Sequence, residues 1–149
     1  MRGRHLPGMP LKYFMRKSIS IPIYGQLVEV YIGELALSKA GKIYSCLDVE
    51  TVKSYEGYAA HFQHNENKQS RFVIYFPNIE ASFGTIAHEC GHSVMQILSH
   101  VGVKVSPKND EAYIYLLGWL VNQVAEAIKI FSKQKTTRDE TPSITKNEK

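Results

Sequence analysis

The chain has 149 residues, a net charge of +4 and a hydrophobic content of 44%, which together are typical of one globular domain with its own core. Much of the excess positive charge lies near the two ends, which argues against a nucleic-acid-binding surface. No uninterrupted apolar run approaches the roughly 18 residues of a membrane helix. The 2 cysteines fit a reducing compartment. We therefore expect a cytoplasmic protein that binds neither nucleic acid nor a membrane.

Composition along the chain predicts three regions. Residues 1–17 hold glycines and prolines among basic side chains, which predicts an irregular arm. Residues 18–133 contain the periodic segments and are expected to form a single domain. Residues 134–149 are polar and include Pro142, which predicts a disordered tail.

The domain begins with two segments that alternate polar and apolar residues. Residues 18–23 and 27–32 have this period of two, which is typical of strands. Gly25 between them is compatible with a hairpin turn or with a bulge inside one strand. Pro22 favours an edge position or the beginning of a strand, because proline cannot donate a hydrogen bond to a neighbouring strand.

A second pair of strands is expected at residues 58–63 and 71–76, joined by a long polar tip. His61 and His64 lie three residues apart, so we expect them at the surface on opposite sides of the first of these strands. The preceding region gives a weaker signal, and predicts only a short helix capped by Asp48.

Two long helices are expected to follow. The first starts after Ser82, a favoured cap, and ends near His100, because Gly102 is a typical stop. The second starts near Ser106 and Pro107 and continues to about residue 133. The predicted fold class is therefore α+β, with a small antiparallel or mixed sheet followed by two long helices.

The first long helix carries the sequence His88-Glu89-Cys90-Gly91-His92, an H-E-x-x-H motif. Histidines four residues apart lie on the same face of a helix and can share one metal ion. Glu89 lies about 100° further round, where it can reach a water on that metal without binding it. Cys90 points away and is expected to be a small buried hydrophobe. The alternative is a pair of core histidines satisfied by hydrogen bonds.

A catalytic zinc ion needs a third protein ligand and an open position. Leu98 stands where a third histidine would follow His92 by six residues, and His100 lies about 12 Å further along the axis. Glu111 is the best candidate, with Asp110 as second choice, because antiparallel helices with a short loop could bring it to the histidines. Alternatively, Glu111 is only a first-turn carboxylate that the helix dipole stabilises. The residues that share its helix face are Glu111, Tyr115, Gly118 and Asn122.

His88-Glu89-x-x-His92 followed by Glu111-Ala112 resembles the gluzincin group of zinc metallopeptidases. Residues 84–124 also resemble small metallopeptidases encoded by bacteriophages. The resemblance implies a zincin-like core with one zinc ion, held by His88, His92 and Glu111. It further implies that Glu89 moves the proton and that a tyrosine, Tyr115 or Tyr113, helps to stabilise the oxyanion.

The implied function is a zinc-dependent peptidase that hydrolyses a peptide bond in a phage or host protein. If a phage encodes the chain, it would act in the host cytoplasm or in association with the virion. An extended substrate would align on a free sheet edge near Phe72–Phe76, and the sequence leaves open which strand forms that edge. The alternative is a non-enzymatic structural or assembly protein of a phage that keeps a zinc-stabilised zincin fold.

Overall fold

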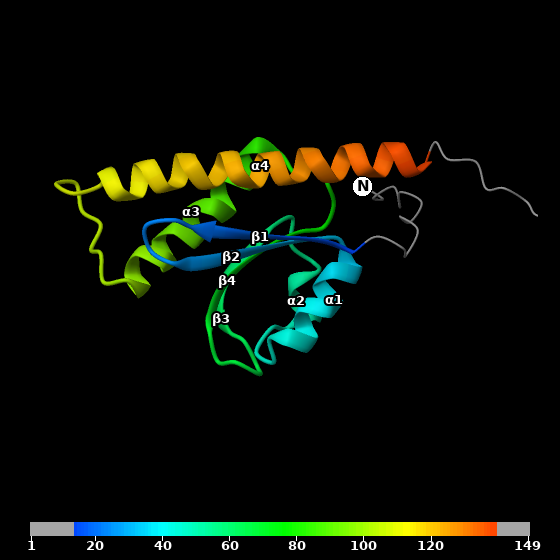
Figure 1. Cartoon of the computed structure of the whole chain (residues 1–149), viewed down its shortest axis with the longest axis horizontal. Helices are drawn as coiled ribbons and strands as arrows, with labels where there is room; N and C mark the ends of the chain where they lie inside the picture. The colour runs from blue at the N-terminus through cyan, green and yellow to red at the C-terminus, as the bar shows by residue number, and fades with distance from the viewer. Residues whose placement is uncertain (1–13, 140–149) are drawn as a thin grey trace, which may run out of the picture.

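The computed structural model describes residues 14–139, which form a four-stranded sheet with helices on both faces (Figure 1). The strands are β1 (Met15–Ile21), β2 (Gln26–Ile32), β3 (Tyr58–Gln63) and β4 (Ser70–Phe76), in the spatial order β1-β2-β4-β3. The pair β2–β4 is parallel and the two outer pairs are antiparallel. The predicted α+β class with a mixed sheet is confirmed.

Strands β1 and β2 form a hairpin, so the alternative of one bulged strand is wrong. Gly25 has a φ of 61°, a value that glycine adopts without strain. Its amide donates a hydrogen bond to the carbonyl of Ile21 at 3.0 Å and closes the turn. Pro22 directly follows β1, which is an edge strand as predicted.

The free edge expected near Phe72–Phe76 belongs to the neighbouring strand β3, because β4 itself is internal. Strand β4 is hydrogen-bonded to β2 on one side and to β3 on the other, so the free edges of the described sheet are β1 and β3. All five side chains of this segment are buried. A strand with apolar residues on both faces is stable only where helices cover both faces, and an internal position provides that.

Helices α1 (Glu34–Ile43) and α2 (Val49–Val52) cover one face of the sheet. The predicted cap of α2 is confirmed, because the Asp48 carboxylate accepts a hydrogen bond from the Thr51 amide at 3.2 Å. Helix α1 was not predicted, and its cap Gly33 makes no side-chain hydrogen bond. The side chains buried on this face are Tyr31, Ala36, Leu37, Ala40, Tyr44, Leu47, Val52, Phe62, Val73 and Tyr75.

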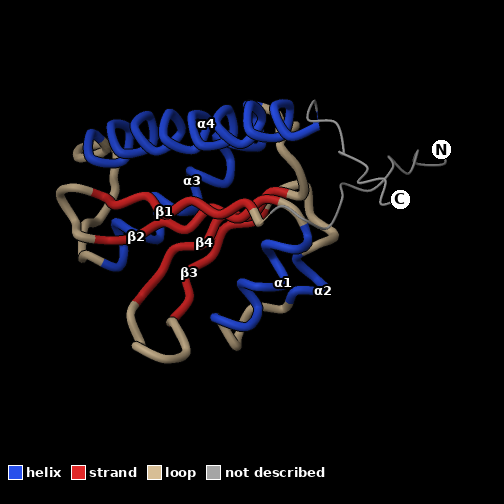
Figure 2. Tube along the Cα trace, turned by 45° about the vertical axis from the view of Figure 1, so that its right-hand side comes forward, coloured by secondary structure: helices blue, strands red, loops and turns tan. Residues whose placement is uncertain are grey.

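Helices α3 (Phe83–His100) and α4 (Glu111–Asp139) cover the opposite face of the sheet, as Figure 2 shows. The predicted cap of α3 is confirmed, because the Ser82 hydroxyl accepts from the Thr85 amide at 3.1 Å. The helix ends at His100, and the φ of 79° at Gly102 allows the Val103 amide to donate to the Leu98 carbonyl at 2.8 Å. This closure is a Schellman motif, and the predicted stop is confirmed.

The boundaries of α4 differ from the prediction. The helix begins at Glu111, because Ser106 and Asn109 form a turn in which the Asn109 amide donates to the Ser106 carbonyl at 3.0 Å. It reaches Asp139, so the first residues of the predicted 134–149 tail are helical, while 140–149 lie outside the described residues.

Strand β1 begins at Met15, inside the arm predicted for residues 1–17, and residues 1–13 of that arm lie outside the described part. Within residues 14–139, one helical segment, Glu111–Thr137, is long and apolar enough by composition to cross a membrane. Of the most apolar part of this segment, 33% is buried, and Leu120 and Val124 are fully buried against the sheet and α3.

Candidate functional site

The imidazoles of His88 and His92 lie together on an exposed face of α3. Their Nε2 atoms are 3.0 Å apart, and the rings meet edge to face with centroids 4.6 Å apart. Two nitrogens that bind one tetrahedral zinc at about 2.0–2.1 Å lie about 3.3 Å from each other. After a small rotation of the rings, the two Nε2 atoms would therefore fit two of the ligand positions of a tetrahedral zinc ion. The 3.0 Å separation also permits a direct hydrogen bond between the rings.

Both histidines are exposed, so the alternative that they are core residues is wrong. Glu89, by contrast, is only 7% exposed. Burial raises the pKa of the Glu89 carboxyl, and the neighbouring His88 and His92 offset part of that rise. The motif thus places a proton-accepting group of raised pKa directly beside two solvent-facing nitrogens.

Gly57, just before β3, brings that strand against Glu89. A Cβ atom at this position would lie 2.8 Å from Cγ and 3.0 Å from Oε1 of Glu89, and 2.9 Å from Cγ2 of Thr85. The sequence reasoning missed this contact, because a glycine before a strand carries no signal of what it will touch. The absence of a side chain here sets the distance between β3 and α3.

Gly57→Ala is expected to lower the free energy of unfolding by about 1–3 kcal/mol, the usual cost of overpacking. The added methyl would overlap side-chain atoms of Glu89 and Thr85, so these must shift. Gly118→Ala is the matched control: no atom lies within 4 Å of its Cβ position, and alanine is favoured in a helix by about 0.5–1 kcal/mol. Urea unfolding of both variants measures the difference. Equal stability of the two would contradict the close approach.

On the other flank of the histidine face, α4 contributes Tyr113. The hydroxyl of Tyr113 lies 3.3 Å from the position of a Cβ at Gly91. Tyr113 is half-buried, whereas Tyr115 is 75% exposed. Of the two tyrosines predicted for the oxyanion, Tyr113 is therefore the one that the structure brings to the motif, and a role for Tyr115 stays a prediction.

The face of α4 that was expected to meet the histidines is exposed to solvent, as His88 and His92 themselves are. The four exposed residues are Glu111, Tyr115, Gly118 and Asn122. Within residues 14–139, no group of three His, Cys, Asp or Glu side chains is placed to share a metal ion. The histidine pair fits two ligand positions, and the third is not assembled. Ligation by Glu111, or by Asp110, stays a prediction.

Cys90 is fully buried in the core beneath the motif, as predicted, whereas Cys46 is exposed. Burial raises the pKa of the Cys90 thiol to about 12, so almost no thiolate is present near neutral pH. A disulfide reagent at pH 8 is expected to titrate one thiol in the native protein and two after denaturation. Rapid reaction of both thiols in the native state would show that Cys90 is accessible.

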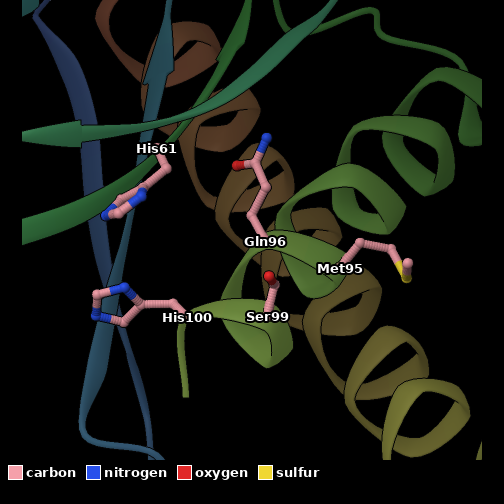
Figure 3. Close-up of a pocket in the computed structure, with 5 residues that line it drawn as sticks. All are labelled: His61, Met95, Gln96, Ser99 and His100. Carbon is pink, nitrogen blue, oxygen red and sulfur yellow. The ribbon is translucent and has the colours of Figure 1, made fainter. Parts of the chain in front are cut away.

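The exposed stripe of α3 continues past the motif into a pocket of about 450 Å³ against β3 (Figure 3). Its lining residues are His61, Met95, Gln96, Ser99 and His100. His61 stacks on the buried ring of Phe72 with centroids 4.6 Å apart, and His100 meets His61 edge to face at 5.0 Å. Sequence reasoning placed His61 at the surface, which is confirmed, but only the strand register shows that it faces His100.

His64 lies on the opposite side of the sheet, where its ring meets Tyr44 edge to face at 6.0 Å.

The chain was compared with known proteins, and no family model, no curated protein and no solved structure matches it. The functional assignment therefore depends on the chemistry of the site itself.

Proposed function

We propose that this protein is a metallopeptidase-like hydrolase that uses one zinc ion and Glu89 to cleave a peptide bond in a phage or host protein. One observation carries the proposal. The Nε2 atoms of His88 and His92 converge to 3.0 Å on an exposed helix face, and a buried carboxylate directly follows the first histidine. These are the groups that H-E-x-x-H chemistry requires.

Each residue of the motif has a defined task. His88 and His92 would hold the ion, with Glu111 as the proposed third ligand. A zinc ion bound there would lower the pKa of a coordinated water and polarise the substrate carbonyl. Glu89 would accept a proton at its carboxylate as water attacks and would donate it to the leaving amine. Burial, which raises the pKa of Glu89, favours its holding the proton between these steps.

The substrate would lie along β3. This strand is an edge of the described sheet, and Gly57 at its start contacts Glu89. An extended peptide can add to such an edge through main-chain hydrogen bonds. The hydroxyl of Tyr113, which lies beside Gly91 on the other flank of the motif, would assist the oxyanion.

A specific observation also favours a non-enzymatic alternative. The histidine rings are at hydrogen-bond distance from each other, and the described residues provide no third metal-binding side chain beside them. A structural or assembly protein of a phage could keep the zincin-like arrangement for stability alone.

Identification of cleavage products distinguishes these functions. Zinc-loaded protein is incubated with an extract of the cells in which its gene is expressed, and new peptide termini are identified by mass spectrometry. The proposal expects termini that the wild type produces and Glu89→Gln does not. Identical termini from both proteins, or none from either, would favour the structural alternative.

A further inference from the structure

Two elements connect the motif to the pocket shown in Figure 3. On α3, the side chains of His92, Met95 and Ser99 are exposed on one stripe that runs from the motif to the pocket. On the other side, β3 starts next to Gly57, which contacts Glu89, and His61 of the same strand lines the pocket. A chain bound along β3 at the motif would therefore also pass the pocket.

The spacing of these residues sets which part of a substrate would reach the pocket. His61 follows Gly57 by four residues, about 13 Å in a strand, and Ser99 follows His92 by seven, about 10 Å along a helix. An extended peptide advances about 3.3 Å per residue. A side chain in the pocket would thus belong to a residue about three or four positions from the bond beside Glu89.

Four of the five lining residues carry polar side chains, and none of the five is a carboxylate. Figure 3 shows the imidazoles of His61 and His100 together on one side, with Gln96 and Ser99 on the other and Met95 turned away. The imidazoles and the hydroxyl can donate hydrogen bonds, and protonated imidazoles carry positive charge.

The buried ring of Phe72 fixes both imidazoles, with centroids 4.6 Å from His61 and 5.8 Å from His100. Burial and then the nearby His100 lower the pKa of His61, because two imidazolium charges in one pocket repel each other. The ring N–H groups of His61 and His100 and the hydroxyl of Ser99 line one space, which therefore suits a group with several hydrogen-bond acceptors, such as a carboxylate.

We infer that this pocket binds an aspartate or glutamate side chain of an extended peptide substrate, an inference that rests on the proposed hydrolase function. Its carboxylate would accept hydrogen bonds from His61 and His100, about three or four residues away from the scissile bond. The pocket would then select which peptide bonds are cut, while the H-E-x-x-H motif cuts them.

Digestion of a peptide library by the zinc-loaded protein tests the selection. We expect Asp and Glu to be enriched at least about tenfold over Asn and Gln at one position three or four residues from the cut. The variant with both His61→Phe and His100→Phe keeps rings against Phe72 but loses the donors, so this enrichment should disappear. His64→Ala, which removes an imidazole from the opposite side of the sheet, should retain it. Cutting without such enrichment, or enrichment that survives in the double variant, would overturn the inference and leave the hydrolase function standing.

Binding without cleavage tests the pocket separately. The imidazole NMR signals of His61 and His100 are followed in the Glu89→Gln protein as an acetylated alanine-serine octapeptide with one glutamate is added. We expect larger shifts than with the twin peptide that carries glutamine instead. Equal shifts with both peptides, or no shift, would overturn the inference whatever the digestion shows. A selective response in a protein whose wild type cuts nothing would instead retain the pocket and reject the hydrolase.

Discussion

Glu89→Gln is expected to lower peptide-bond hydrolysis by about 100- to 10,000-fold while leaving zinc content and fold unchanged, because general acid–base catalysis contributes that much. Glutamine has the shape of glutamate and can fill the same space against Gly57 and Thr85. Its amide cannot accept a proton from water at neutral pH. The values of kcat/KM for a peptide that spans an identified cut site, together with metal analysis and circular dichroism, measure the three properties.

A matched substitution separates a local effect from a general effect of charge. Glu126→Gln removes a carboxylate from an exposed position on α4, where its Oε2 is 3.8 Å from Nζ of Lys129. We expect wild-type values for rate and zinc content, because an exposed ion pair of this kind contributes little. A Glu89→Gln protein that is as active as the wild type would reject the hydrolase proposal, even if zinc remained bound.

Local signals in the sequence were sufficient for most helices and strands. The cap at Ser82, the stop at Gly102 and the glycine turn at Gly25 each act within a few residues, so all three could be predicted. Helix α1 escaped prediction because Gly33 provides no side-chain cap and two of its three buried residues are alanines. Weak capping and small apolar residues leave little periodic signal.

The arrangement of the strands could not be predicted in the same way. Parallel pairing of β2 with β4 joins residues that are about 44 positions apart, such as Val28 and Phe72, and α1, α2 and β3 lie between them in the chain. Local alternation of polar and apolar residues carries no information on such a pairing. The apolar run Phe72–Phe76 did contain a usable signal, since a strand that is apolar on both faces favours the interior of a sheet.

The candidate site likewise contains some features that local sequence signals predict and others that depend on long-range contacts. His88 and His92 share a face because of their spacing within one helix, which the sequence alone determines. Gly57 and Tyr113 reach the motif from β3 and α4, and neither contact has a local signature. The face of α4 that carries Glu111 is difficult to assign from the sequence, because apolar residues surround its first turns and Ile114 is exposed among them. Periodicity cannot identify the buried face of such a segment.

His88→Ala is expected to lower zinc affinity by more than about 100-fold. Loss of a residue that only hydrogen-bonds to a metal ligand lowers affinity by about 10- to 100-fold, and loss of the ligand itself should have a larger effect. The wild type should bind one zinc ion per chain. Competition with a chromophoric chelator measures the affinity. His64→Ala is the control, because it removes an imidazole on the opposite side of the sheet. Wild-type affinity in His88→Ala would reject the metal site.

The same titration decides the third ligand. Glu111→Ala should weaken zinc binding as strongly as His88→Ala if Glu111 completes the site. Asp110→Ala should do so if Asp110 is the ligand instead. If either residue is a ligand, zinc should also change the amide NMR signals of residues 103–111, because these residues lead into the first turn of α4. If neither acidic variant affects zinc binding, the ion is held by the histidine pair without a ligand from this segment, and the gluzincin arrangement is wrong for this protein.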